Sequence, residues 1–355
     1  MISITKQKWL FLAIIISITA IIIFTTIITS VQAPDVDNQQ SNTGEASDAF
    51  AFADQSDVSD TVSRSEEESS MEPEDESSEP EILFPEVPML DAKSVFLCDM
   101  EGNEIFSHNP DRVSSPASLT KLVTASVVIE HMSVDTVVTV GREVNMIEPD
   151  SSIASLAAGN RHTVYELLAG LLICSGNDAA YVLAVATART VHDEELSEQE
   201  ALEKFCDMMN EFAAEIGMEN SYFGSPDGYD ASGQHTTARD MALIADYCYR
   251  NDTIRELCST ALFFTDPVRG RETVWRNSNA FLIRESEFFN EYVLGMKTGT
   301  TSTAGKCLIS VYSKDGVEVI AVVMGCTDDG DRYTDSITLF EYAEEFYSLN
   351  VSLVQ

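Results

Sequence analysis

The sequence predicts an α+β domain in which strands from both ends of one folded segment build a mixed sheet and helices lie between them. Three observations indicate this fold. Residues 89–355 open with two short runs rich in β-formers and close with three more such runs before a final helical run. The stretches between them are apolar or amphipathic at helical spacing. The segment is also long enough to bury a substantial core.

An apolar run of the type that spans membranes precedes this domain, within residues 1–33. No charged residue occurs between Trp9 and Ala33, and the run exceeds the ~7–15 apolar residues of a signal-peptide core. It reaches the ~20 residues that a spanning helix needs. We expect an uncleaved anchor with the remainder of the chain exported, while the small residues before Pro34 leave a cleaved signal peptide open.

Residues 34–88 form an acidic, serine-rich segment with 17 Asp and Glu residues and a single basic residue, Arg64. Such a composition buries too little apolar surface to offset chain entropy, which predicts a disordered linker. The whole chain carries a formal net charge of −38, and the domain after the linker stays strongly acidic. A nucleic-acid partner is therefore not expected, because phosphates need a basic face.

The seven cysteines are an odd number without any Cys-x-x-Cys pair, a pattern that suits neither a zinc site nor a disulfide-dense module. We expect most of them to be small buried apolar residues, and the sequence leaves their pairing open. No metal or other cofactor is predicted.

The first half of the domain is expected to contain strands and one helix. Residues 92–109 predict two strands around a turn at Glu101-Gly102-Asn103. The stretch "SSPASLTKLVTASVVIEHM" predicts a helix that Ser115 caps and Pro116 begins. Residues 135–140 predict a short extended segment.

The second half predicts three helical runs, three strands and a last helix. Residues 162–188 read as an apolar helix interrupted near Ser175-Gly176-Asn177, and residues 197–218 as an amphipathic helix that Gly217 ends. A helix over 237–250 follows. Residues 291–326 predict three strands with Asp315-Gly316 as a hairpin turn, and residues 335–349 a closing helix.

Three short motifs contain candidate functional side chains. Ser118 and Lys121 are three residues apart near a helix start, so a hydroxyl, an amine and unpaired backbone N–H groups converge. "CSGND" places Ser175 and Asn177 at a break in an apolar helix, where polar groups are costly unless they line a cavity. "KTGT" lies on a predicted edge strand, with Gly299 leaving room for a ligand to approach the backbone.

The ordered set Ser-x-x-Lys, Ser-x-Asn, Lys-Thr-Gly resembles the penicillin-binding and serine β-lactamase superfamily. Within it, "PASLTKLVTA", "VYELLAGLLICSGNDAA", "MNEFAAEIGMENSYFGSPDGYD", "HTTARDMALIA" and "KTGTTSTAGKCLIS" are similar to D-alanyl-D-alanine carboxypeptidases of low molecular mass, over about residues 90–348. The resemblance implies an antiparallel sheet flanked by helices, a helical subdomain, a peptidoglycan pentapeptide substrate, an acyl-enzyme and inhibition by β-lactams.

The resemblance also implies roles for the motif residues. Ser118 would be the nucleophile, Lys121 its base in the neutral form, and Ser175 the relay of a proton to the leaving D-alanine. The remaining five are expected to bind substrate. Asn177 would bind the peptide amide, Lys297 would act through positive potential and the Ser175 hydroxyl, and Thr298 would bind the terminal carboxylate. Gly299 would leave the backbone open to the substrate, and Thr300 would bind an oxyanion through its N–H together with that of Ser118.

Some positions depart from the family pattern or stay open. The family often has His at the position of Asp227 and Leu at that of Tyr229, which affects substrate detail. His235 matches a family position but is expected to be structural. Arg332 is expected either to reach the substrate carboxylate or to form a surface salt bridge.

Other functions fit the sequence less well. A rapidly deacylating β-lactamase would need a Glu-x-x-x-Asn pattern, which is absent between the second and third motifs, and neither Gly-x-Ser-x-Gly nor His-Glu-x-x-His occurs. A transpeptidase or endopeptidase on the same scaffold and an inactive wall-binding homologue remain as alternatives. The expected location is the outer face of the cell membrane, attached through the N-terminal segment, because the chain stops after its last helix without a basic amphipathic stretch.

Overall fold

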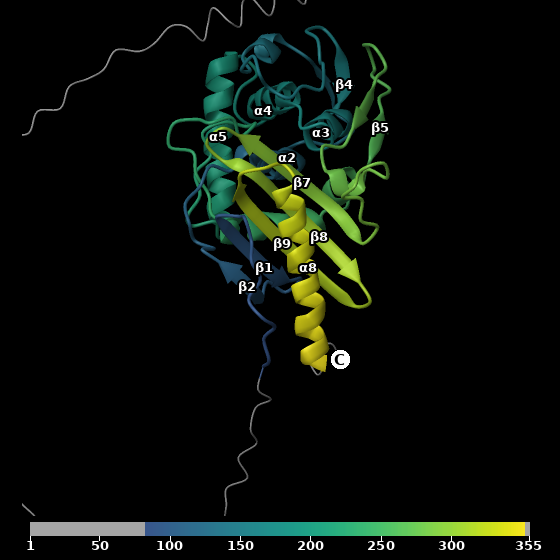
Figure 1. Ribbon diagram of the computed structural model, residues 1–355. Helices are drawn as coiled ribbons and strands as arrows, with labels where there is room; N and C mark the ends of the chain where they lie inside the picture. Colours follow the sequence, from purple (N-terminus) through teal and green to yellow (C-terminus); the bar gives the residue numbers. More distant parts are fainter. Residues whose placement is uncertain (1–81, 352–355) are drawn as a thin grey trace, which may run out of the picture. The chain divides into compact units, whose positions relative to one another are not determined.

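The computed structural model describes residues 82–351, and these form an α+β unit built on a five-stranded sheet (Figure 1). The strands are β1 (Ser94–Asp99), β2 (Glu104–His108), β7 (Val293–Thr301), β8 (Gly305–Lys314) and β9 (Val317–Cys326). Their order is β2-β1-β9-β8-β7, and all four neighbouring pairs are antiparallel.

The predicted mixture of parallel and antiparallel strands is therefore wrong. The sheet consists of one hairpin, β1-β2, and one meander, β7-β8-β9, and β1 joins the meander antiparallel to β9. The long connection from β2 to β7 links the two edge strands, which are not neighbours, and every neighbouring pair is antiparallel. The antiparallel sheet implied by the family resemblance is confirmed.

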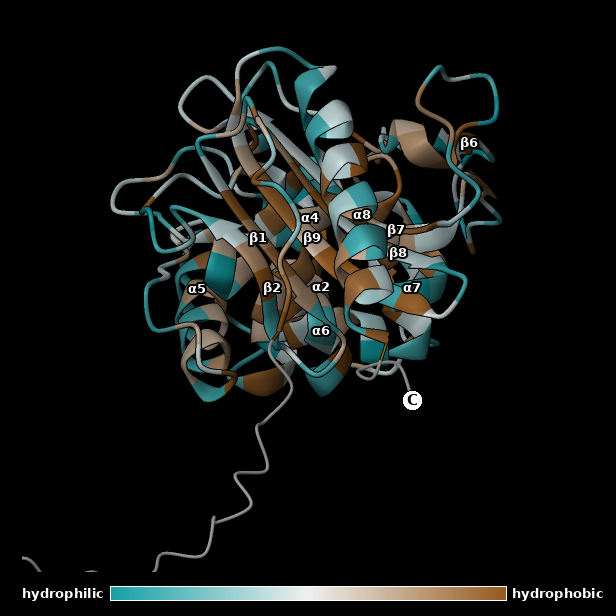
Figure 2. Ribbon diagram, turned by 60° about the horizontal axis from the view of Figure 1, so that its bottom comes forward, coloured by the Kyte–Doolittle hydropathy of each residue, from teal (hydrophilic) through white to brown (hydrophobic). Residues whose placement is uncertain are grey.

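Both faces of the sheet are buried, which explains the nearly continuous apolar run of β9. Val319, Ala321 and Val323 lie in the same cluster as Phe340 of α8 (Asp331–Leu349). Ile320, Val322 and Met324 point to the opposite face and join the core of the helical part. Figure 2 shows hydrophobic residues along the central strands and hydrophilic residues on the outer side of α8.

The helical part occupies the chain between the sheet's two halves. It contains α2 (Thr120–His131), α3 (Val164–Leu172), α4 (Asn177–Val191) and α5 (Glu198–Glu215). Nine of the twelve residues of α2 are buried, so this helix is the centre of the subdomain. The break between α3 and α4 and the end of α5 near Gly217, whose φ is +88°, occur where the sequence predicts them.

Further elements complete the unit. Helix α6 (Ala238–Arg250) covers β1 and β9, and α7 (Asp252–Ser259) packs on β7. Two small ribbons pair β3 (Val137–Thr139) with β4 (Arg161–Thr163) and β5 (Leu262–Phe264) with β6 (Val274–Arg276). Short 3-10 turns are η1 (Ala117–Leu119), η2 (Arg142–Asn145) and η3 (Ala280–Leu282).

Residues just before β1 are attached to the last helix. The backbone N–H of Leu83 donates to Asn350 Oδ1 at 2.9 Å, and Asn350 Nδ2 donates to the Leu83 carbonyl at 2.7 Å. The ring of Phe84 lies 5.7 Å from that of Phe346. The predicted apolar anchor and the acidic linker up to residue 81 lie outside the described residues. Among residues 82–351, no helix is both long enough and apolar enough to cross a membrane.

Candidate active site

Ser118 lies in a 3-10 turn directly before α2 rather than within an α-helical first turn. The expected cap is wrong, because the hydroxyl of Ser115 donates to Asp230 Oδ1 at 2.7 Å instead. Ala117 has φ +49° and is packed from two sides by glycines. A Cβ on Gly228 would lie 1.9 Å from the Ala117 carbonyl oxygen, and one on Gly299 would lie 3.1 Å from the Ala117 Cβ. The turn that presents Ser118 is thus shaped by tertiary contacts.

The role expected for Gly299 changes accordingly. The space that its missing side chain leaves is occupied by η1, since Leu119 Cγ and the Pro116 carbonyl oxygen would both lie 3.3 Å from an added Cβ. Gly299 therefore lets strand β7 approach the turn that carries Ser118.

Lys121 is completely buried, and its amine lies 2.8 Å from Ser118 Oγ. The same amine donates to Asn177 Oδ1 at 2.8 Å and to the backbone carbonyl of Asp227 at 2.6 Å. Three elements far apart in sequence thus fix the direction of the Lys121 amine toward the serine hydroxyl.

The break between α3 and α4 presents Ser175 and Asn177 to the same place. Ser175 has φ +60°, a conformation that ends α3 and turns the chain toward α4. Asn177 Nδ2 donates to Ser151 Oγ at 2.8 Å. Asp178 accepts the backbone N–H groups of Ala154 and Leu156 at 2.7 and 2.9 Å, and so holds the loop that carries Ser151.

Strand β7 is an edge strand, as predicted, and it supplies the third motif. Lys297 is completely buried and donates to Ser175 Oγ at 2.9 Å and to the Thr298 carbonyl at 3.0 Å. The Thr298 hydroxyl lies 2.7 Å from that of Ser278. The motifs therefore form two serine–lysine pairs, Ser118 with Lys121 and Ser175 with Lys297.

Burial changes the acid–base properties of both lysines. Desolvation lowers the pKa of Lys121 to about 8, although the charge of Asp227 acts against this shift. Desolvation and then the charge of Lys121 lower the pKa of Lys297 to about 7. The two ammonium groups repel each other, so the charge of Lys121 disfavours a second positive charge on Lys297.

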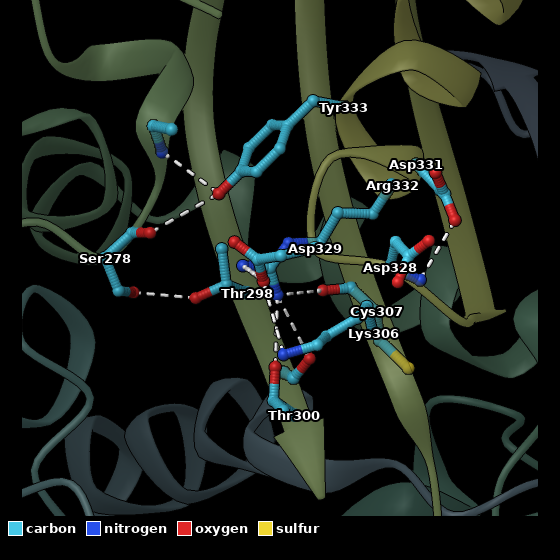
Figure 3. Close-up of polar contacts among 12 residues, drawn as sticks. Ser278, Thr298, Thr300, Lys306, Cys307, Asp328, Asp329, Asp331, Arg332 and Tyr333 are labelled. Atoms are coloured by element: carbon cyan, nitrogen blue, oxygen red, sulfur yellow. Dashed lines mark hydrogen bonds and ion pairs between the residues drawn. The ribbon is translucent and has the colours of Figure 1, made fainter. Parts of the chain in front are cut away.

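Arg332 is itself buried beside the end of β7, and the salt bridge considered from the sequence forms with the exposed carboxylate of Asp329 (Figure 3). Its Nη1 donates to the Gly299 carbonyl at 3.3 Å and to the Thr300 hydroxyl at 3.2 Å. Its Nη2 pairs with Asp329 at 2.8 Å, and Lys306 lies 3.4 Å from the same carboxylate. This arrangement concentrates positive charge next to Thr298 and Thr300.

A cleft of about 600 Å³ opens over Ser118. Its walls include Asn177, the segment 228–230 and the segment 300–302. The phenol of Tyr229 donates to Asp150 Oδ1 across this cleft at 2.9 Å.

Sequence reasoning did not assign Asp178, Asp227 or Ser151 to the site. Asp178 follows the second motif directly, so its position at a helix start was a usable signal. Ser151 and the Asp227 carbonyl act through loops whose approach depends on the tertiary fold. His235 lies outside the cleft, where its Nδ1 is 2.6 Å from the Gly233 carbonyl and its ring stacks on Tyr222.

Comparisons with known proteins point to one family. Residues 82–328 match the model of the family described as D-alanyl-D-alanine carboxypeptidase. The chain is 31% identical over 277 residues to D-alanyl-D-alanine carboxypeptidase DacC of Escherichia coli K12, covering 74% of this chain and 63% of that protein. It is 30% identical over 254 residues to the D-alanyl-D-alanine carboxypeptidase of Streptomyces sp. K15, covering 68% and 82%.

Solved structures agree with this result. The crystal structure of the Streptomyces K15 DD-transpeptidase superposes with a TM-score of 0.67 at 27% identity, and the match covers 73% of this chain and 98% of the other. The D-alanyl-D-alanine carboxypeptidase DacD of Francisella tularensis superposes with a TM-score of 0.64 at 26% identity, covering 75% and 73%. The chain thus spans nearly two thirds of DacC and nearly all of the K15 structure.

Proposed function

Since the chain belongs to the D-alanyl-D-alanine carboxypeptidase family, we propose that it is a serine-type peptidase that removes the terminal D-alanine from peptidoglycan stem pentapeptides. The observation that carries the proposal is the 2.8 Å distance between the buried Lys121 amine and Ser118 Oγ, since Ser118 lines an open cleft. A hydroxyl next to an amine with a lowered pKa is an activated nucleophile.

In the acylation step, Ser118 Oγ attacks the carbonyl carbon of the penultimate D-alanine and its proton passes to the neutral amine of Lys121. The backbone N–H groups of Ser118 and Thr300 are the proposed donors to the oxyanion. Preorganised donors of this kind are worth ~10²–10³ in turnover each, so their placement by η1 and β7 is central to the rate.

Collapse of the tetrahedral intermediate breaks the peptide C–N bond, and the leaving D-alanine amine takes up a proton through Ser175. Lys297 supports this role because its amine donates to Ser175 Oγ at 2.9 Å. Water then hydrolyses the serine ester, which releases the shortened peptide and regenerates Ser118. Each turnover consumes one water molecule. The proton that Lys121 takes from Ser118 passes through Ser175 to the leaving amine. In the hydrolysis step Lys121 takes a proton from the attacking water and returns it to Ser118 Oγ, so its amine ends neutral.

The cationic end of the cleft suits the substrate's terminal carboxylate. Thr298 would donate its hydroxyl, while Arg332 and Lys297 would supply positive potential from behind the strand. A bound carboxylate would also favour the protonated form of Lys297, whose pKa burial lowers to about 7. Asn177, held by Ser151, would bind the peptide amide.

A transpeptidase or endopeptidase is the second candidate on the same site. One solved relative is named a DD-transpeptidase, and the two activities share the acyl-enzyme and differ in whether water or an amine accepts the acyl group. The geometry of Ser118 and Lys121 is compatible with both acceptors.

The remaining parts of the proposal concern location. We propose that the apolar run from Trp9 to Ala33 anchors the chain and that the catalytic unit acts on the outer face of the cell membrane. The support is the length of this run and the basic residues before it.

The test combines a labelled penicillin with a muropeptide ending in D-Ala-D-Ala. Penicillin should acylate Ser118 and be released slowly, and the muropeptide should lose one D-alanine. Ser118→Ala should abolish both results in a folded protein, whereas Ser302→Ala, which removes another hydroxyl of the cleft, should still be labelled. An adduct mapped to any other residue contradicts the mechanism, and a product with an added amine would identify transpeptidation.

A further inference from the structure

The loop that follows α5 places Asp227 directly behind the serine–lysine turn. The Pro226 carbonyl accepts the Thr124 hydroxyl at 2.6 Å, and the Asp227 carbonyl accepts the Lys121 amine at 2.6 Å. Gly228, with φ +80°, then fits against the Ala117 carbonyl. Three successive residues of this loop are therefore fixed on the turn and the helix that carry Ser118 and Lys121.

The side chain of Asp227 is buried with hydrogen-bonding capacity left over. Its exposed fraction is 1%. Oδ1 accepts the backbone N–H of Tyr229 at 3.0 Å, whereas Oδ2 has no hydrogen-bond partner among residues 82–351. A buried carboxylate oxygen without a donor is costly unless a nearby positive charge compensates for it.

The neighbours of this carboxylate identify Lys121 as that charge. Tyr181 of α4 and Cys206 of α5 face Asp227, and burial raises the pKa of both, that of Cys206 to about 12, so both stay neutral. Lys121 is the cation that faces this carboxylate, and its amine also donates to the backbone carbonyl of Asp227.

Other charged or titratable groups face Lys121 from the remaining elements. Cys174 approaches from the break between α3 and α4, Asp178 from α4 and Lys297 from β7. Both oxygens of Asp178 already accept backbone N–H groups. Asp227 is therefore the facing carboxylate that retains an oxygen without a donor.

We propose that Asp227 is a positioning residue that sets the basicity of Lys121: its carbonyl aims the amine at Ser118, and its buried carboxylate is the countercharge of the protonated amine. The inference rests on the proposed function, because it concerns the base of that reaction. A countercharge stabilises the protonated lysine, so it makes Lys121 a stronger proton acceptor that is neutral only at higher pH.

The test is the pH dependence of Ser118 acylation by a labelled penicillin in Asp227→Asn. Asparagine keeps the acceptor for the Tyr229 N–H and removes the charge. The acidic limb of the rate profile should move to lower pH by about one unit or more, as expected when one buried charge acts on another through a protein interior. The plateau at high pH should fall, because the lysine becomes a weaker base.

A matched control separates this effect from the general loss of a negative charge. Asp207→Asn removes an exposed carboxylate from α5. The acidic limb of its acylation rate profile should coincide with that of the unchanged protein. Asp227→Glu keeps the charge, so its limb should stay closer to the original than that of Asp227→Asn.

The outcomes are distinct. A folded Asp227→Asn protein that loses rate equally at all pH values, or whose limb moves upward, overturns the inference. If Asp227→Asn does not fold, the same rate profile is measured for Asp227→Ser, whose smaller side chain can still accept the Tyr229 N–H. An acidic limb that does not move to lower pH then overturns the inference. If the unchanged protein is not acylated on Ser118 at all, the proposed function itself has failed.

Discussion

The Lys297 amine donates to Ser175 Oγ at 2.9 Å, and this contact joins the edge strand of the sheet to a break between two helices of the subdomain. The two residues are 122 positions apart in the sequence. A second contact of the same type, between Lys121 and Ser118, lies within one turn of chain. The candidate active site thus lies at the junction of sheet and helical subdomain, and its two lysines are buried because both parts cover them.

The first prediction concerns pH. With the pKa of Lys121 lowered to about 8 by burial, the neutral amine becomes the main form only above that value. The rate of Ser118 acylation should therefore rise with pH through the range of about 7 to 8 and decline as the pH falls below it. The rate of penicillin labelling, measured in reactions quenched at successive times at pH 5.5–9, gives this profile. A rate that is flat across this range would contradict a lysine base.

The second prediction concerns the identity of the base. Lys121→Arg should be nearly inactive in acylation, because a guanidinium stays protonated at any useful pH. Lys204→Arg is the control, since Lys204 is exposed on α5. An arginine variant that keeps most of the acylation rate would remove Lys121 from this role. Circular dichroism of both variants checks that the fold is retained.

Residue spacing explains how much of this arrangement the sequence could predict. Positions three apart on a helical turn are neighbours, so Ser118 and Lys121 were expected close together, and "KTGT" was expected on an edge strand. The 3-10 turn at Ala117 was not predictable, because it depends on contacts with Gly228 and Gly299 from distant segments. The capping by Ser115 failed for the same reason, since Asp230 takes its hydroxyl.

Short elements were missed where local signals are weak. Helix α7 has eight residues, and each strand of the β5-β6 ribbon has three, of which the inward-facing Phe263 and Trp275 carry the packing. The antiparallel direction of all strands was also not predictable from the sequence pattern. Both the mixed and the antiparallel sheet satisfy the same apolar pattern, and only the pairing of β1 with β9 decides between them.

The third prediction concerns the glycine against which Ala117 packs. Gly228→Ala should destabilise the protein and slow acylation sharply, because the added Cβ would lie 1.9 Å from the Ala117 carbonyl oxygen. Gly233→Ala is a matched control with nearly the same φ, +79°, but with 3.8 Å to the nearest atom. It should lose only the ~1–2 kcal/mol of a positive φ. Urea unfolding and penicillin labelling of both variants measure the difference, and equal losses would contradict the packing argument.

The fourth prediction concerns stability and pH. The pKa of Lys297 is about 7 in the folded protein and 10.5 in the unfolded chain. Between these values the unfolded chain binds more protons, so the free energy of unfolding should rise with pH. Each lysine of this type contributes up to about 1.4 kcal/mol per pH unit. The window is pH 7–9, because thiols of the unfolded chain, with a pKa of 9.0, ionise above it and act in the opposite direction.

Lys297→Met removes the contribution of Lys297 to this pH dependence. Its unfolding free energy, measured in urea at pH 6, 7, 8 and 9, should rise less steeply than that of the unchanged protein, since one titrating group is gone. Lys204→Met removes an exposed lysine and should keep the original slope. Identical slopes in Lys297→Met and the unchanged protein would show that Lys297 stays protonated in the folded state.

The fifth prediction concerns the N-terminal segment, which lies outside the described residues. The run from Trp9 to Ala33 is long enough to span a bilayer, and the acidic segment after it would be repelled by anionic lipid within a Debye length of ~8 Å. We therefore expect the full chain to fractionate with membranes and to retain Trp9. Ala33→Leu removes the small residue before Pro34 that a signal peptidase would need, so an anchored protein should behave identically with this change. Fractionation followed by sequencing of the mature N-terminus gives the answer for both chains. A soluble product that begins at or after Pro34, and that disappears in Ala33→Leu, would replace the anchor with a cleaved signal peptide and leave the acidic segment as the free N-terminus of a diffusing enzyme.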